Sequence, residues 1–299
     1  MKKFFPAFYF GLLILMFALI VASCKQQPTP SQQIYSQVDM DSFHIRAVYK
    51  FPNYNNISDL LKLIMDVDIG FIPDAVNDFE NLDKYSSNDN LTAANIGIYM
   101  ADIAYAWMFN ETDIAMNCNM AAITLADQLE MANVFLDSFI QKYDKEDLDP
   151  NAILLLLEQD LNEAIKQLPE EKNLELYSAM LTGTFIEKLH LVYEMIKNCP
   201  EISDSPDVIL ENLQKLVWIA NGQVKAFEEL NKQINSYEIP EESRLFQTEL
   251  INLHTMMHEA VFLNDTSNVS TINLINDQEF IALYQEVNKT RGYIINPAK

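Results

Sequence analysis

The sequence predicts an all-α fold, and three observations carry that prediction. Nearly every long segment repeats its apolar residues every three or four positions, which is the period of a helix with one buried face. No segment sustains the alternating apolar and polar pattern of a half-buried strand. Glycine supplies only 6 of 299 residues, which argues against a fold built on many tight turns. We therefore expect an irregular antiparallel helical bundle, or a short αα-hairpin solenoid, of about eight to ten helices.

The first half of the predicted domain contains two short helices and then two long ones. The short helices are expected over residues 57–69 and 73–82. Asn90 is the predicted cap of a long helix over residues 91–109, which is apolar nearly all round and should therefore be central. A second long helix is expected over residues 111–131. Its apolar stripe consists of Ile114, Cys118, Ala121, Leu125 and Leu129.

This pair of helices resembles a helical hairpin of the tetratricopeptide family. Small residues alternate with large ones in both helices, which would let the two pack closely. These small residues are Ala101, Ala104, Ala106, Ala115, Ala121, Ala122 and Ala126. The family's ~34-residue period does not repeat along the chain, so a bundle and a short solenoid both stay open.

Prolines mark the helices of the second half. Asp149 followed by Pro150 is a helix start, and its helix should run to Leu168. The next helix is expected over residues 174–198 and should be stopped by Pro200. Ser205, Pro206 and Asp207 then begin the most regular helix of the chain. Its stripe consists of Ile209, Leu213, Leu216, Ala220, Val224, Phe227 and Ile234.

Two helices and a loop complete the prediction. Pro240 should open a helix that ends near Leu263. Residues 264–276 are polar and predict a loop, and a last helix is expected over residues 277–290.

The first 33 residues have a different composition from the rest of the chain. Lys2 and Lys3 precede an almost wholly apolar run over residues 4–21, which are the parts of a secretory signal. The run ends in Val21-Ala22-Ser23-Cys24 and is followed by the polar stretch KQQPTPSQQ. An aliphatic residue, two small residues and a cysteine resemble the lipobox of bacterial lipoprotein precursors. An uncleaved membrane-anchoring helix is the alternative, since the run approaches the ~20 residues that a span needs.

The lipobox resemblance implies how the chain is processed and where it goes. Cleavage would fall between Ser23 and Cys24, and the Cys24 thiol would carry fatty acyl chains such as palmitate. Residues 1–23 are then a signal peptide, residues 24–33 a lipidated tether, and residues 34–299 a single helical domain. In some Gram-negative lineages acidic residues just after the cysteine mark surface lipoproteins, and here none occurs before Asp39. We therefore expect the periplasmic face of the outer membrane, with membrane contact through Cys24.

Charge and motif content exclude several functions. Without Lys2 and Lys3 the mature chain has 18 basic and 43 acidic side chains, a net charge of −25. Because nucleic-acid binding depends on clustered lysine and arginine, we expect no nucleic-acid partner. The sequence contains no G-x-S-x-G elbow, Walker loop or G-x-G-x-x-G motif, so we expect no cofactor. Cys118 and Cys199 are expected to be half-buried thiols that an exported setting would permit to pair.

One polar stripe is the leading candidate for ligand binding. Asn95, Tyr99 and Asp102 follow one another at intervals of four and three residues in the central helix, and so share one face. A carboxylate in an apolar helix must find hydrogen-bond donors or become neutral. The stripe either lines a pocket, where Asp102 would receive a cationic or hydroxylated group, or forms a structural network between helices. The structural network is the favoured interpretation, because buried polar groups usually have structural partners.

A second polar stripe consists of Glu187, His190 and Glu194. Its E-x-x-H spacing is that of di-iron carboxylate bundles, but no second copy of the motif occurs in the chain. The stripe lies opposite the apolar face of its own helix, so we expect it to be solvated. That apolar face consists of Phe185, Leu189, Val192 and Ile196.

His254 and His258 lie one helical turn apart, a spacing that zinc sites use. Two ligands do not complete a tetrahedral site, so a half-buried histidine beside one at the edge of the apolar stripe is the favoured interpretation. The sequence therefore leaves two functions open. The leading one is a non-enzymatic lipoprotein that binds or scaffolds a protein, peptide or small ligand. The alternative is a metal-dependent enzyme that would use Asp102, Glu187, Glu194, His254 and His258.

Overall fold

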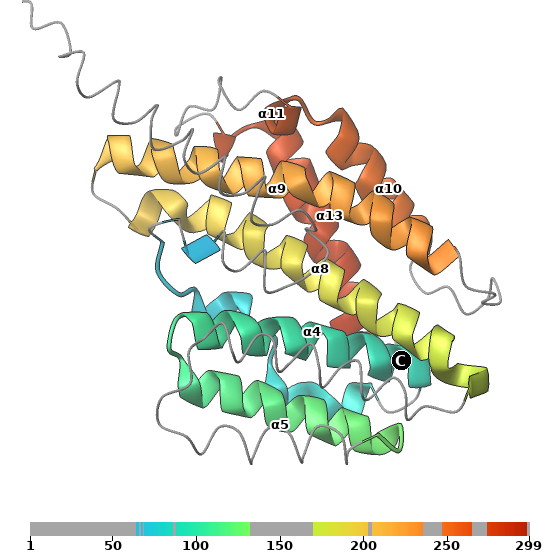
Figure 1. Ribbon diagram of the computed structural model, residues 1–299. Coiled ribbons are helices and arrows are strands. Elements are labelled where there is room, and N and C mark those ends of the chain that lie inside the picture. The colour runs from blue at the N-terminus through green and yellow to red at the C-terminus, as the bar shows by residue number, and fades with distance from the viewer. Residues whose placement is uncertain are drawn as a thin grey trace, which may run out of the picture. The chain divides into compact units, whose positions relative to one another are not determined.

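A computed structural model describes residues 64–65, 67, 69–85, 88–131, 170–202, 205–235, 247–264 and 274–297 (Figure 1). All of them belong to one compact unit that begins at Ala47. The described residues form seven α-helices and two short 3-10 helices and contain no strand, so the all-α prediction is confirmed for them. Within these ranges no helix has the length and apolarity that a membrane span requires. The leader, the tether and the predicted helices over 149–168 and most of 57–69 lie outside the described residues.

Helix α4 (Asp89–Met108) is the centre of the described fold. It packs against α8, α5 and α13, and 16 of its 20 residues are buried, as its uniformly apolar sequence predicts. Its cap is Asn88 and not Asn90, because the Asn88 side chain accepts the backbone N–H groups of Asn90 and Leu91. The Asn90 side chain instead donates to Glu175 on α8 at 2.6 Å.

Helix α5 (Thr112–Gln128) follows α4 after a three-residue connection and packs against it, as Figure 1 shows. The connection contains Asn110, whose φ of 60° is the left-handed conformation that asparagine adopts more readily than most residues. The predicted end of α5 at residue 131 is too late, since the helix ends at Gln128 and Glu130 also has a positive φ of 61°.

Helices α8 (Glu170–Ile202) and α9 (Pro206–Asn235) are the two longest described elements and pack against each other. The prediction that Pro200 stops α8 is wrong, because the helix continues to Ile202. Proline removes one backbone hydrogen bond, and the packing of α8 against α4, α9 and α13 outweighs that loss at the last turn. The predicted start of α9 at Pro206 is confirmed.

Two glycines let α4 and α8 cross at close range. A methyl group added at Gly97 on α4 would overlap the backbone carbonyl of Met180 on α8. One added at Gly183 on α8 would overlap the backbone carbonyl of Ala94 on α4. The Thr184 hydroxyl donates across the same crossing to the carbonyl oxygen of Gly97 at 3.1 Å. At the crossing the two helix backbones are therefore in direct contact, and only glycine fits at positions 97 and 183.

The C-terminal helices depart from their predicted boundaries. The helix expected over 240–263 is interrupted at Ala260, giving α10 (Gln247–Glu259) and α11 (Val261–Asn264). Helix α13 (Gln278–Ile295) begins as predicted, with the Asp277 side chain accepting the N–H groups of Glu279 and Phe280. It extends beyond the predicted end at residue 290, because Arg291 and Ile294 are buried against the rest of the fold.

The helix predicted over residues 73–82 is instead two 3-10 helices, η1 (Pro73–Ala75) and η2 (Phe79–Lys84). Between them the backbone N–H of Asn77 donates to the Asp102 carboxyl group at 3.0 Å. In a continuous helix the Asn77 N–H would donate to a carbonyl oxygen of the same helix, but here it donates to Asp102 of α4.

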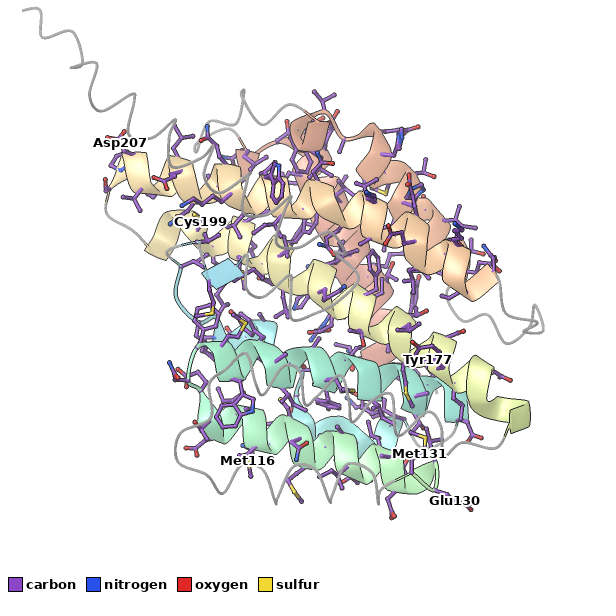
Figure 2. All side chains as sticks on the ribbon, viewed as in Figure 1. Met116, Glu130, Met131, Tyr177, Cys199 and Asp207 are labelled. Carbon is purple, nitrogen blue, oxygen red and sulfur yellow. The ribbon has the colours of Figure 1, made fainter. Side chains whose placement is uncertain are left out.

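The prediction that the two thiols are half-buried is wrong, and the disulfide that the sequence left open is not formed. Cys118 and Cys199 are free and fully buried, at 0% and 2% exposure. Figure 2 shows Cys199 on α8, near the end of α9 that begins at Pro206, and its thiol donates to the carbonyl oxygen of Ile209 at 3.8 Å. Burial raises the pKa of Cys199 to about 11 and raises that of Cys118 further, so neither thiol is a reactive thiolate at neutral pH.

Candidate functional site

The predicted ligand stripe is completely buried. Asn95, Tyr99 and Asp102 all have 0% exposure. The Asn95 amide donates to the carbonyl oxygen of Ile294 on α13 at 3.0 Å, and the Tyr99 hydroxyl donates to the carbonyl oxygen of Asp78 at 2.8 Å. Asp102 accepts the Asn77 N–H, as described above. The stripe therefore ties α13 and the segment between η1 and η2 to the central helix, which is the structural network that the sequence favoured.

The second stripe is not solvated, which corrects the prediction for Glu187 and His190. Glu187 is 0% exposed and receives two hydrogen bonds from Arg291 on α13, at 2.6 and 2.8 Å. Arg291 is itself 8% exposed, so this is a buried two-point ion pair. The apolar face of α8 packs elsewhere, with Phe185 against Phe227 of α9 at a ring separation of 5.6 Å. Helix α8 is thus covered on both faces.

The polar contacts between α8 and α13 continue along both helices as an antiparallel ladder. One turn beyond the Glu187–Arg291 pair, the His190 ring lies 2.7 Å from the side-chain oxygen of Asn288. A further turn along, the Tyr284 hydroxyl donates to the Glu194 carboxylate at 2.5 Å. Glu187, His190 and Glu194 therefore form one surface that fastens α13 to α8.

His190 is held between two helices and η1. Its Nε2 atom lies 3.0 Å from the carbonyl oxygen of Ala75, which accepts only, so this nitrogen carries the proton and donates. Burial and the nearby positive charge of Arg291 lower the pKa of His190, while Glu187 and Glu194 oppose that shift. The neutral ring then accepts at Nδ1, which requires the Asn288 side chain to present its amide nitrogen there. Arg291 also reaches the Ala75 carbonyl, at 3.4 Å.

The two buried carboxyl groups have different surroundings, because Glu187 pairs with Arg291 and Asp102 accepts a backbone N–H. Burial raises the pKa of Asp102 well above its ordinary value, and repulsion from Glu187 raises it further, while Arg291 opposes the shift. Burial opposes the charge of Arg291, but the attraction and hydrogen bonds of Glu187, together with the nearby Asp102 and Tyr85, outweigh it and raise the pKa of the guanidinium. Glu187 and Arg291 thus form a buried ion pair, and the neighbouring Asp102 keeps its proton to higher pH than an exposed aspartate does. Chemically, the cluster is an internal ion pair beside a weakened acid.

The raised pKa of Asp102 predicts a pH dependence of stability. Because the folded-state pKa exceeds the unfolded one, the contribution of Asp102 is complete below the unfolded pKa and is lost as pH rises through the folded pKa. Asp102→Asn is neutral throughout, so relative to wild type it should gain about 1.4 kcal/mol per pH unit inside that window. Urea unfolding of both proteins from pH 4 to pH 9 measures the difference. Parallel stability curves would contradict a protonated Asp102.

The two candidate metal ligands of α10, His254 and His258, make their contacts with residues outside the cluster of Asp102, Glu187 and Arg291. His254 is half-buried and stacks on Phe227 of α9 at a ring separation of 4.7 Å, and its Nε2 lies 3.8 Å from Glu228. His258 is exposed, with its ring 6.2 Å from that of His254. The favoured interpretation of this pair is confirmed. Within the described ranges, no three histidine, cysteine, aspartate or glutamate side chains are grouped as a metal site requires.

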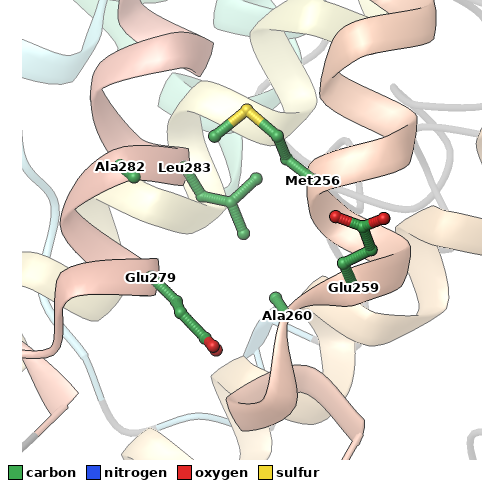
Figure 3. Close-up of a pocket in the computed structure, with 6 residues that line it drawn as sticks. All are labelled: Met256, Glu259, Ala260, Glu279, Ala282 and Leu283. Atoms are coloured by element: carbon green, nitrogen blue, oxygen red, sulfur yellow. The ribbon is translucent and has the colours of Figure 1, made fainter.

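A small pocket lies between α10 and α13, with a volume of about 200 Å³ (Figure 3). Met256, Ala260, Ala282 and Leu283 form its apolar lining, and the side chains of Met256 and Leu283 extend toward each other. Glu259 and Glu279 complete the lining from opposite sides, and Glu279 also accepts the backbone N–H of Val261 at 2.8 Å. The pocket is smaller than the ~300 Å³ typical of small-molecule sites and is close to the size of one side chain.

No protein-family model matches the chain, and comparisons with curated proteins and with solved structures found no significant match. Sequence reasoning found Asp102 and Glu187 but missed two residues that complete the cluster, Arg291 and Asn77. Arg291 carried a signal, because it lies on the face of its helix that also contains the apolar residues Val287 and Ile294. Asn77 contributes its backbone N–H, which no side-chain pattern marks.

Proposed function

We propose that the protein is a bacterial envelope lipoprotein whose acidic helical body is a non-enzymatic binding or scaffold module. The anchoring part rests on Val21-Ala22-Ser23-Cys24 at the end of an apolar leader. Acylation of Cys24 would anchor the chain stably, because several acyl chains on one cysteine hold a protein in a membrane. The proposed location is the periplasmic face of the outer membrane, since no acidic residue follows Cys24 before Asp39. The body would be an irregular bundle of antiparallel helices, which the contacts of α4 with α5, α8 and α13 support.

One observation favours a binding module over the metal-dependent enzyme. The side chains that an enzyme would use are bonded to other protein groups and hold helices together. Glu187 is occupied by Arg291, Asp102 accepts from Asn77, and Glu194 accepts from Tyr284. A carboxylate committed to a buried ion pair is not available to a metal or a substrate without breaking that pair, which is costly.

The α10–α13 pocket is the described feature most suited to receive a partner. Its apolar lining fits the aliphatic part of one side chain, and Glu259 and Glu279 favour a positive charge at its end. The charge of −25 on the mature chain points the same way, since it attracts basic partners over a distance. We infer that the pocket accepts a lysine or arginine side chain of a partner protein.

Purification from detergent-solubilised membranes tests both parts of the proposal. The intact mass of the wild-type protein should correspond to a chain that begins at Cys24 and carries fatty acyl chains. The Cys24→Ala variant should incorporate no labelled palmitate. Label retained by Cys24→Ala would refute the anchor.

Pull-downs from the same membranes test the pocket. A partner recovered with the wild type should be lost with Ala282→Trp, which fills the pocket. Ile281→Trp is the matched control, because it places the same side chain at a neighbouring exposed position of α13 that is not part of the pocket lining. A partnerless monomer that turns over compounds from a substrate panel would refute the binding function.

A further inference from the structure

Residues 73–85, which contain η1 and η2, are called the η1–η2 segment below. Where this segment and α13 lie against α4, five buried side chains each have a polar atom without a hydrogen-bond partner in the described structure. We call this set the polar seam. It consists of the Asn77 amide nitrogen, the Tyr85 hydroxyl, the Asn95 amide oxygen, one Asp102 oxygen and the Thr290 hydroxyl. None of these residues is more than 4% exposed. Bulk water therefore does not reach these atoms, and a buried polar atom that is left without a hydrogen bond destabilises the fold.

The members of the polar seam lie near one another. The backbone N–H of Asn77 donates to Asp102, and the Tyr85 carbonyl accepts the hydroxyl of Thr92, which lies one helical turn before Asn95 and two before Tyr99 on α4. Asn95 donates to Ile294, which is one turn from Thr290 on α13. The polar seam thus follows one face of α4, where α13 and the η1–η2 segment meet it.

The Tyr85 hydroxyl lies near polar side chains but forms no hydrogen bond with them. Burial raises the pKa of Tyr85, and the side chains of Asn77 and Tyr99 and the charge of Arg291 act against that shift. The hydroxyl is therefore close enough to Asn77 and Tyr99 to interact with them, yet it forms no hydrogen bond of good geometry with either. Polar groups held near one another at such separations are those that an ordered water bridges.

Tyr193 provides the contrast within the same protein. Its hydroxyl is also buried and without a partner in the described structure, but burial alone raises the pKa of this tyrosine and no polar or charged side chain contributes. Its ring stacks on Phe280 at 5.9 Å. A water molecule there would find too few polar partners, since a buried water usually makes about three hydrogen bonds.

We propose that the polar seam is a binding site for ordered water molecules, which link the η1–η2 segment and α13 to α4. Water suits the chemistry because the set mixes donors with acceptors. Asn77 donates, Asn95 accepts, and the hydroxyl groups of Tyr85 and Thr290 do both. The bridges complete the connections that the direct hydrogen bonds of Asn95, Tyr99 and Asp102 begin.

Removing one hydroxyl at each tyrosine tests the site, because the two substitutions should have opposite effects. Tyr85→Phe should lower the folding equilibrium constant about tenfold, since it breaks a hydrogen bond to water. Tyr193→Phe should leave the constant unchanged or raise it, since it removes a hydroxyl that bonds to nothing. Urea unfolding of both variants and of wild type gives the comparison. A Tyr85→Phe variant as stable as Tyr193→Phe would overturn the proposal.

Oxygen-17 relaxation dispersion of the folded proteins gives a second, independent measurement. Long-lived internal waters should give a dispersion in wild type that decreases in Tyr85→Phe and in Thr290→Val but not in Tyr193→Phe. An equal dispersion in all four proteins would overturn the proposal. A wild-type melting temperature that falls when choline replaces potassium and sodium at constant ionic strength would also overturn it, because the polar seam would then hold a cation.

Discussion

Gly97→Ala is expected to destabilise the protein by about 3 kcal/mol or more, and Gly183→Ala by a similar amount. The added methyl group would overlap a backbone carbonyl of the facing helix in both cases. A side chain could turn away, but a helix backbone yields only if α4 and α8 separate along their whole contact. Such a separation would also disturb the polar contacts that depend on the position of α4. The free energy of unfolding in urea measures the effect.

Gly292→Ala is the matched control, because Gly292 is also inside a helix but has open space where its methyl group would lie. Alanine there should stabilise the protein by about 1 kcal/mol through helix propensity alone. The three substitutions are chemically identical, so their difference isolates the crossing. Similar effects at all three positions would show that α4 and α8 do not approach as closely as described.

Arg291→Met is expected to cost about 3–5 kcal/mol, because it leaves the Glu187 carboxylate buried without its partner. Lys289→Met on the same helix is the control. Lys289 pairs with Glu286 at the surface, where 53% of its side chain is exposed, and its loss should leave the free energy of unfolding nearly unchanged. Thermal and urea unfolding at pH 7 compare the two variants.

The double variant Glu187→Met with Arg291→Met distinguishes the loss of a favourable pair from the exposure of an unpaired charge. Apolar side chains of similar size should recover most of the lost stability, since the cost of Arg291→Met comes mainly from the carboxylate left behind. A double variant that is less stable than Arg291→Met would mean that the pair itself contributes the stability.

The fold class was predictable from the sequence because helical period is a local property. The uniform burial of α4 followed from its lack of a polar face, and the starts of α9 and α13 followed from Pro206 and Asp277. The passage of α8 beyond Pro200 was not predictable, because packing against other helices decided it. Local signals place helix starts well when a cap forms within the same segment.

The candidate site was predictable only in part, because it depends on which helices meet. The stripe of Asn95, Tyr99 and Asp102 could be recognised as one face, and its need for donors followed from burial. The burial of Glu187 could not be recognised, because α8 has a single apolar face and a helix with one apolar face is expected to be buried on that side only. The second covering helix, α13, is distant in sequence, and a single arginine on it pairs with Glu187.

The 104-residue separation between Glu187 and Arg291 has a consequence for synthesis of the chain. Helices α4 and α8 leave the ribosome long before α13 exists, so the nascent chain holds an uncompensated carboxylate at the place where they would pack. Premature compaction of that half is therefore unfavourable until the last helix is made. If the chain is exported as proposed above, such a delay would keep it unfolded enough to be threaded across the membrane until transport is complete.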